Sequence, residues 1–156
     1  EYFSRKQIGV LPVMCGFQAS GSAPIVLGRP IKQPKTIATA IRIGNPASWK
    51  QAQAARDDSG GCIDKVTDRQ ILKAYAFLTR NEGVFVEPAS AASVAGLFQM
   101  AENGYLKRFP ASKEICIVCT VTGHGLKDPK TAIDNVRAPK VYPKDLAKVA
   151  KAAGLK

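Results

Sequence analysis

The amino-acid sequence predicts an α/β fold with a mainly parallel sheet and flanking helices. Three short apolar stretches, 10–18, 62–66 and 115–121, have the length and composition of buried strands. Two longer stretches, 67–81 and 88–103, have helical features and separate the second strand from the third. Strands that alternate with helices usually pair in parallel, and the helices that connect them cover the faces of the sheet. We therefore expect one parallel sheet with both helices packed on it.

The first half of the chain is expected to alternate between loops, a strand and a helix. Residues 19–35 are rich in Gly, Pro and Ala, so they form a loop that is a candidate to line a site. Residues 36–43 mix β-branched residues with alanine, and their class stays open. Residues 47–57 have a helical composition, and the segment 59–61 ends that helix with two glycines.

The helix at 67–81 has the clearest local signals. Thr67 and Gln70 form a capping box, in which each side chain satisfies a free backbone N–H of the first turn. Gly83 is the glycine that commonly follows the last turn of a helix. An apolar stripe with the helical period runs along the helix and consists of Ile71, Leu72, Tyr75, Ala76, Leu78 and Thr79.

The helix at 88–103 is distinguished by small side chains. Pro88 suits its first turn, and Gly104 marks its end. Small side chains let a helix approach a sheet or a ligand closely, and both uses stay open for this helix. The small residues are Ala89, Ser90, Ala91, Ala92, Ser93, Ala95 and Gly96. The strand at 115–121 is apolar on both faces, as a central strand of a parallel sheet should be.

Composition and charge restrict the class of partner. With 156 residues, of which 46% are apolar and 22% charged, the chain is long enough for one domain with a core. No apolar stretch is long enough to span a bilayer, so we expect no membrane partner. The formal net charge is +11, but the basic residues of the C-terminal tail are loosely spaced. They do not alternate with aromatic residues, which favours a solvated basic surface and argues against a nucleic-acid partner.

The four cysteines are expected to be buried free thiols. Cys116 and Cys119 have the spacing of half a zinc knuckle, but residues three apart on a strand point to opposite faces, so the pair cannot grip one metal ion there. His124 is the single histidine of the sequence, so no histidine pair completes a metal site. Free thiols indicate a reducing compartment, and we expect a cytoplasmic protein without a metal.

Candidate chemistry gathers after the strand 115–121, since ligands of parallel sheets bind at the carboxyl ends of the strands. Thr122 places a hydroxyl at the strand tip, and the neighbouring glycines, Gly123 and Gly125, let the backbone turn sharply. His124 is a candidate general base, but no local motif supplies it with a nucleophile. Glu87 precedes a helix whose dipole stabilises a carboxylate, so it is either a cap or a ligand-binding residue.

Three stretches of this sequence resemble the threonine synthase family: Thr36–Trp49, Gly83–Ser93 and Cys119–Pro129. They occur in the order and spacing of that family, and the resemblance covers nearly the whole chain. The second and third stretches are also similar to the broader class of pyridoxal-phosphate lyases and dehydratases, which implies a tryptophan-synthase-beta-like fold. The first stretch, through Arg42–Pro46, points more narrowly to threonine synthase.

The resemblance implies pyridoxal 5'-phosphate as the cofactor and assigns three positions to its site. Thr122 matches the residue whose hydroxyl hydrogen-bonds the pyridine nitrogen of the cofactor. Ala40 matches the position whose backbone lies along the cofactor ring, and Glu87 matches an acidic residue near the edge of the ring. His124 stands where asparagine is also common in the family, so its role stays open.

The resemblance further implies a reaction, in which O-phospho-L-homoserine and water become L-threonine and phosphate by γ-elimination and β-addition of water. The lysine that forms a Schiff base with the cofactor belongs to a Ser/Thr-Phe-Lys-Asp motif, and this sequence contains neither that motif nor a Gly-Gly-Asn loop for the cofactor phosphate. We therefore assign no catalytic residue here. We expect the lysine upstream of this chain, in an N-terminal part of the same enzyme, and expect this chain alone to be inactive.

We interpret the chain, which starts at Glu1 without an initiator methionine, as the C-terminal part of a longer enzyme. Residues 1–139 are expected to belong to the cofactor-binding domain and residues 140–156 to a C-terminal helical tail. At full length we expect a homodimer. Two other functions stay open: another pyridoxal-phosphate enzyme, such as threonine dehydratase, or a basic non-enzymatic binding module.

Overall fold

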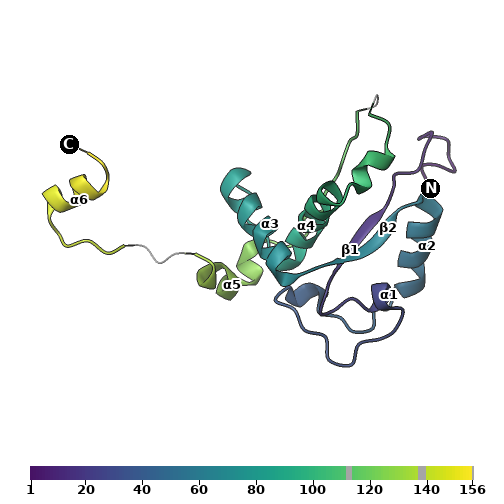
Figure 1. Cartoon of the computed structure of the whole chain (residues 1–156), viewed down its shortest axis with the longest axis horizontal. Helices are drawn as coiled ribbons and strands as arrows, with labels where there is room; N and C mark the ends of the chain where they lie inside the picture. Colours follow the sequence, from purple (N-terminus) through teal and green to yellow (C-terminus); the bar gives the residue numbers. More distant parts are fainter. Residues whose placement is uncertain (112–113, 137–139, 156) are drawn as a thin grey trace.

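The computed structural model describes residues 1–111, 114–136 and 140–155. The described residues form a two-stranded sheet, and Figure 1 shows helices on both of its sides. Three of the helical elements, named η, are short 3₁₀ turns. The order along the chain is β1 (Cys15–Ala19), α1 (Pro24–Leu27), η1 (Thr39–Ile41), α2 (Trp49–Ser59), β2 (Cys62–Val66), α3 (Asp68–Asn81), α4 (Pro88–Glu102), η2 (Tyr105–Arg108), η3 (Gly125–Lys127), α5 (Pro129–Asp134) and α6 (Leu146–Ala152).

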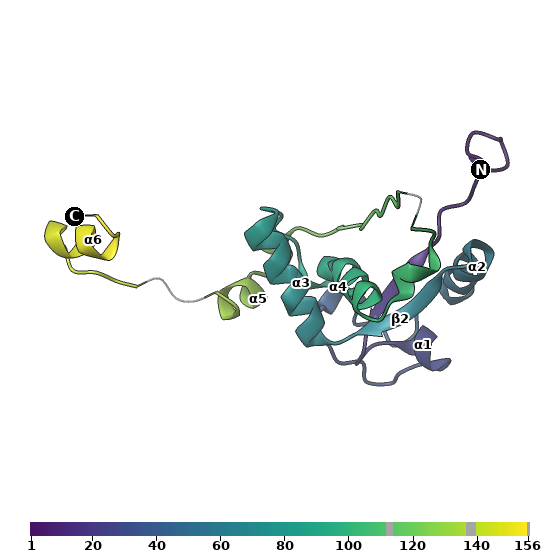
Figure 2. The same ribbon diagram turned by 45° about the horizontal axis from the view of Figure 1, so that its top comes forward.

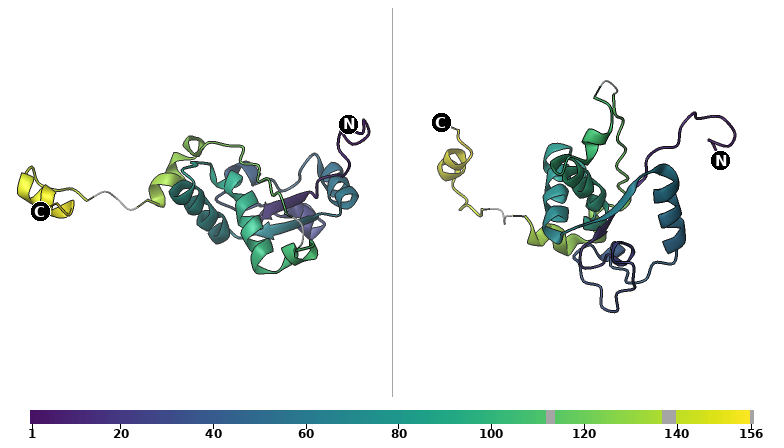
Figure 3. Two further views of the ribbon diagram at one scale, coloured as in Figure 1. Left: turned by 90° about the horizontal axis from the view of Figure 1, so that it is seen from above. Right: turned by 45° about the vertical axis from the view of Figure 1, so that its right-hand side comes forward.

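The two strands β1 and β2 form a parallel pair, which confirms the predicted α/β class. Their register runs from Cys15 opposite Cys62 to Ala19 opposite Val66. Helices α3 and α4 pack against each other, and α4 contacts both strands. The helices α1 and α2 contact β2 from the other side, as Figures 1 and 3 show. The sheet therefore lies between two helical layers.

Helix α4 forms the centre of the core because its small side chains let it lie close to the strands. A Cβ atom added at Gly96 would overlap the ring of Phe17 on β1, so only glycine fits there without displacement of that ring. Most of the first three turns of α4 is buried. The core residues are Ala19, Ala38, Val66, Ile71, Ala74, Tyr75, Leu78, Val86, Ala91, Ala92, Val94 and Ala95.

Both long helices confirm the sequence prediction. Helix α3 begins with the predicted capping box: the backbone N–H of Gln70 donates to Thr67 Oγ1 at 3.2 Å, and the N–H of Thr67 donates to Gln70 Oε1 at 2.8 Å. After α3, Gly83 has a φ of 68°, and after α4, Gly104 has a φ of 79°. These left-handed conformations favour glycine and end the helices where the sequence predicts.

Two predicted strands differ in the structure. Residues 114–121 are extended but pair with no strand among the described residues, and Val118 is 84% exposed. The apolar pattern of a strand cannot specify which neighbour it pairs with. The stretch 10–18 pairs only from Cys15, because its partner strand begins at Cys62, directly after the turn that ends α2. Residues 10–14 are exposed.

Three further expectations are resolved by the structure. The open segment 36–43 contains the 3₁₀ turn η1 and no strand, and the predicted helix at 47–57 is α2. The cysteines are free, but the prediction that all are buried is wrong: Cys116 is exposed, and the other three are partly exposed. The physical reason for Cys116 is that its segment pairs with no strand among the described residues, which leaves this side chain exposed.

The C-terminal helix α6 lies apart from the other helices (Figure 2). The predicted domain boundary between 139 and 140 falls at residues 137–139, which lie outside the described residues, so the division into domains stays a prediction. None of the described helices has the length and apolar character that crossing a bilayer requires.

The contact between Gly96 and Phe17 predicts a large effect for a single substitution. We expect Gly96→Val to lower the free energy of unfolding by about 1–3 kcal/mol, since the added side chain must displace the Phe17 ring. The matched control is Ala101→Val, which introduces the same residue on an exposed turn of α4 and should cost less than about 1 kcal/mol. Equilibrium urea unfolding measures both. Equal losses in the two variants would contradict the packing argument.

Candidate functional site

The segment that contains Thr122 lies across the start of α4. Two backbone hydrogen bonds fasten it there: the N–H of Glu87 donates to the carbonyl of Gly123 at 2.8 Å, and the N–H of Gly125 donates to the carbonyl of Phe85 at 3.1 Å. The turn that contains Gly123 and Gly125 is therefore held against the residues that precede α4. This places Thr122 and Glu87, two of the three predicted site residues, in one cluster.

The buried hydroxyl of Ser90, in the first turn of α4, is the centre of this cluster. Ser90 is 3% exposed. Its Oγ accepts hydrogen bonds from the backbone N–H groups of Thr122, at 3.1 Å, and Gly123, at 2.7 Å. The same oxygen lies 3.3 Å from Thr122 Oγ1 and 3.3 Å from the carbonyl oxygen of Gly123. One side chain thus fixes both the backbone and the hydroxyl of Thr122.

The hydroxyl proton of Thr122 is not accepted by Ser90. A serine hydroxyl has two acceptor lone pairs and one proton. The two backbone N–H groups occupy both lone pairs of Ser90, so Ser90 can only donate to Thr122 or to Gly123. The proton of Thr122 is therefore left for another acceptor. Since Thr122 is exposed on this chain, that acceptor can be a ligand.

Thr120, two residues before Thr122, also has a hydroxyl, but its environment differs. Ser93 Oγ donates to the carbonyl oxygens of Ser90, at 3.0 Å, and Thr120, at 3.1 Å. This contact aligns the backbone of Thr120 but does not involve its side chain. The hydroxyl that reaches the Ser90 cluster is that of Thr122.

Glu87 takes the N-cap position of α4, but its carboxylate makes no cap hydrogen bond. The carboxylate is almost fully buried, and Lys127 Nζ lies 3.4 Å from its Oε1. A Cβ atom at Gly123 would overlap the carboxylate, so the glycine is what allows Glu87 to approach the turn. Of the two roles that the sequence left open for Glu87, capping by its side chain is not the one it performs.

His124 contacts its own segment. Its Nδ1 accepts a hydrogen bond from the backbone N–H of Leu126 at 3.2 Å and so caps η3. Its ring stands edge-on to the ring of Phe85, with 5.5 Å between the centroids. These contacts give His124 a structural role. A neutral imidazole has one acceptor nitrogen, and the hydrogen bond from Leu126 uses it, so that nitrogen is not free to accept a proton as a general base.

Ala40 lies in η1, a segment that also contacts α4. The turn is held by Ser22, which is 1% exposed. The hydroxyl of Ser22 donates toward the carbonyl oxygens of Ile41, at 3.0 Å, and Ile43, at 3.2 Å. Ala40 itself is exposed. Ala40 therefore lies in a turn that contacts α4, and no hydrogen bond among the described residues joins it to the cluster of Ser90, Thr122 and Glu87.

The residues that fix the site were not identified from the sequence. Ser90 was one small residue in a run, and Ser22 was one residue of a loop. Asp68, at the start of α3, accepts hydrogen bonds from Thr36 Oγ1 at 2.5 Å and from the N–H of Ile37 at 3.2 Å. All three act on partners at least 19 residues away. For Asp68 and Ser90, a polar side chain in the first turn of a helix with a buried face was the available signal.

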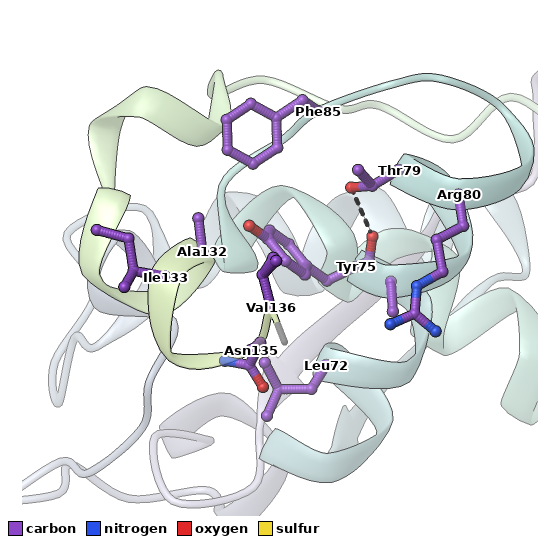
Figure 4. Close-up of a pocket in the computed structure, with 10 residues that line it drawn as sticks. Leu72, Tyr75, Thr79, Arg80, Phe85, Ala132, Ile133, Asn135 and Val136 are labelled. Carbon is purple, nitrogen blue, oxygen red and sulfur yellow. Dashed lines mark hydrogen bonds between the residues drawn. The ribbon is translucent and has the colours of Figure 1, made fainter. Parts of the chain in front are cut away.

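A separate cavity of about 700 Å³ lies between α3 and α5 (Figure 4). It shares Phe85 with the surroundings of the cluster. The Thr79 hydroxyl donates to the carbonyl of Tyr75 at 3.0 Å, so it is engaged within its own helix. The mostly apolar lining consists of Leu72, Tyr75, Ala76, Thr79, Arg80, Phe85, Ala132, Ile133, Asn135 and Val136. The Ser90 cluster has more polar groups directed at one point and is the better candidate site.

Residues 1–121 match the family described as pyridoxal-phosphate dependent enzyme. The chain belongs to this family. It is 48% identical to the threonine synthase of Mycobacterium leprae over 155 residues, which cover 99% of this chain and 42% of that protein. It is 54% identical to the threonine synthase of a Synechocystis strain over 125 residues, which cover 80% of this chain and 31% of that protein. The chain thus spans less than half the length of these relatives.

A solved structure shows the same fold. The L-serine ammonia-lyase from the fungus Rhizomucor miehei superimposes with a TM-score of 0.58 at 15% identity, over 78% of this chain and 40% of that one. At this identity the likeness concerns the fold alone. It agrees with the parallel strands and flanking helices described above and with the expected fold of pyridoxal-phosphate dependent enzymes.

The residues at the Ser90 cluster fit the cofactor of this pyridoxal-phosphate family. The pyridine nitrogen of pyridoxal phosphate can accept a hydrogen bond, and Thr122 has a hydroxyl proton that Ser90 cannot use. Gly123 and Gly125 have no side chains that would cover the turn, and a Cβ atom at either would overlap Glu87 or Phe85. A neutral donor and an open backbone can accommodate one edge of such a ring.

The Ser90 hydroxyl gives a second prediction. Ser90→Ala leaves the N–H groups of Thr122 and Gly123 without their acceptor, which should cost about 1–3 kcal/mol of unfolding free energy. Ser93→Ala, a matched control in the same helix, removes a donor to carbonyl oxygens and should cost less, because water can reach the exposed Thr120. Urea unfolding of both variants measures the difference. A larger loss for Ser93→Ala would mean that Ser90 is not the centre of the cluster.

Proposed function

We propose that this chain forms one wall of the cofactor site of a threonine synthase, the enzyme that converts O-phospho-L-homoserine and water to L-threonine and phosphate. The observation that carries the proposal is the 48% identity to a threonine synthase over 99% of the chain. When bound, pyridoxal phosphate supplies the electron sink for this chemistry. The residues of this chain bind and orient it.

In this proposal Thr122 donates its hydroxyl proton to the pyridine nitrogen. A hydroxyl is a neutral partner and favours an unprotonated ring, whereas a carboxylate would favour a pyridinium. Ser90 holds the Thr122 backbone and leaves its proton available, which supports this assignment. The backbone at Ala40 lies along the ring. Glu87, with Lys127 3.4 Å from its carboxylate, lies near the edge of the ring.

Other parts of the active site belong to residues outside these 156. We assign the lysine that is linked to the cofactor, and the loop that binds the cofactor phosphate, to an N-terminal part of the same enzyme. The greater length of the threonine synthases that this chain resembles supports this division. The full-length enzyme is a cytoplasmic homodimer in this proposal, and the chain described here has no activity alone.

The test of the proposed activity is an assay of the full-length protein with pyridoxal phosphate and O-phospho-L-homoserine. We expect threonine and inorganic phosphate to be released in equal amounts. Threonine serves as the competing substrate, because a threonine dehydratase converts it to 2-oxobutanoate and ammonia. Turnover of threonine without turnover of O-phospho-L-homoserine would overturn the proposed activity. It would still agree with a pyridoxal-phosphate dependent enzyme of another activity.

The role of Thr122 has its own test in the full-length enzyme. Thr122→Val keeps the shape of the side chain but removes the donor, and an unmatched polar group costs roughly 1–3 kcal/mol. We therefore expect cofactor affinity to fall by about tenfold. Thr122→Ser should be tolerated, and Thr122→Asp should favour a protonated ring and increase side products.

The matched control for Thr122→Val is Thr120→Val, two residues earlier in the same segment. Fluorescence titration with pyridoxal phosphate and the yield of threonine are measured for all four variants. If Thr120→Val loses cofactor while Thr122→Val behaves like the wild type, Thr120 is the partner of the ring nitrogen and the assignment is wrong.

A further inference from the structure

Two cysteines lie opposite each other where the parallel strands begin. Cys15 is the first residue of β1, Cys62 is the first residue of β2, and the two are register partners. Paired residues of neighbouring strands point to the same face of the sheet. Adjacent strands lie about 4.8 Å apart, and disulfides join residues whose Cα atoms are about 4.4–6.8 Å apart. The backbone therefore already brings the two thiols within reach of a bond.

The side chains around the pair form a polar cluster under η2. The Cys15 thiol contacts the hydroxyl of Tyr105, with 4.0 Å between Sγ and the phenolic oxygen. Arg108 Nη1 donates to the same oxygen at 2.7 Å, and the guanidinium lies 5.0 Å from the centre of the Tyr105 ring. Burial and the two neighbouring thiols raise the pKa of Tyr105 to about 12, so its hydroxyl stays neutral. Both cysteines are partly exposed on this chain.

The other two cysteines differ from this pair in geometry. Cys116 and Cys119 are three residues apart in a segment that forms no strand, and Cys116 is exposed while Cys119 is partly buried. Burial raises the pKa of the Cys119 thiol, while Cys116 is exposed. They provide an internal comparison, because they are present in the same protein without a partner on a neighbouring strand.

We propose that Cys15 and Cys62 form a reversible dithiol site, which closes to a disulfide by exchange with a low-molecular-weight disulfide of the glutathione class. The thiolate of Cys15 attacks one sulfur of the small disulfide, forms a mixed disulfide and releases one small thiol. The thiolate of Cys62 then attacks the Cys15 sulfur and releases the second small thiol. Two protein thiols and one small disulfide thus give one protein disulfide and two small thiols, and no other oxidant is needed.

The reactivity of Cys62 depends on its surroundings. Burial raises the pKa of the Cys62 thiol, and the neighbouring Cys15 thiol raises it further. Closure of the ring requires the thiolate of Cys62. Because the thiolate is the reactive form, the rate of closure should rise about tenfold per pH unit below that pKa.

The position of the pair determines what the bond would change. Cys15 and Cys62 lie at the amino ends of the strands, whereas the site residue Ser22 follows the carboxyl end of β1. A bond there would not enter the proposed cofactor site. It would close the loop of residues 16–61, which contains η1 and Ala40, and so restrict the unfolded chain. The oxidised protein should have a higher Tm.

The experiment treats the full-length protein with oxidised glutathione and maps its peptides by mass spectrometry without reduction. We expect a Cys15–Cys62 linked peptide, two reduced glutathione molecules released for each such disulfide formed, and a rise in Tm that dithiothreitol reverses. Cys62→Ala should stop the reaction at a mixed disulfide and abolish the rise in Tm, whereas Cys116→Ala should leave both unchanged.

Three results would overturn the proposal. In the wild type, glutathione could remain attached to Cys15, or the linked peptide could contain Cys116 or Cys119. The rise in Tm could also persist in Cys62→Ala. The peptide map of the wild type needs no variant, so the proposal remains testable even if a substitution impairs folding. Its outcome does not depend on the substrate of the enzyme.

Discussion

The hydrogen bonds of the Ser90 hydroxyl are the interaction on which the candidate site depends. This buried group joins the first turn of α4 to a turn 32 residues later in the chain. Its two lone pairs accept hydrogen bonds from the backbone N–H groups of Thr122 and Gly123. These bonds fix the turn, and they also prevent Ser90 from accepting the hydroxyl proton of Thr122. Because a buried N–H without an acceptor is costly, the turn and the helix hold each other in place.

Helix α4 connects this site to the core. At its start Glu87 lies against Gly123, and further along Gly96 lies against Phe17 of β1. In both places the absence of a side chain on glycine sets the distance between two segments. The helix therefore packs on the strands with one part and supports the turn that contains Thr122 with another. A shift of α4 toward or away from the sheet would move Thr122 with it.

The helices could be predicted from local signals, whereas the contacts between distant segments could not. The capping box of Thr67 and Gln70 is contained in four residues, and α3 begins there as expected. The segment 115–121 has the pattern of a central strand, but the pairing of a strand depends on a neighbour, and its own residues do not specify one. Thr122 was identified through resemblance to a family. Ser90 was missed because its partners are far along the chain.

In the proposed site Thr122 offers a neutral hydrogen bond to the ring nitrogen of the cofactor. The most direct test is the ¹⁵N chemical shift of ring-labelled pyridoxal phosphate bound to the full-length enzyme, measured by NMR between neutral and mildly alkaline pH. The account predicts the shift of an unprotonated, hydrogen-bonded pyridine nitrogen, which moves when Thr122 is replaced by valine. The shift of a pyridinium in the wild type, unchanged in Thr122→Val, would contradict it.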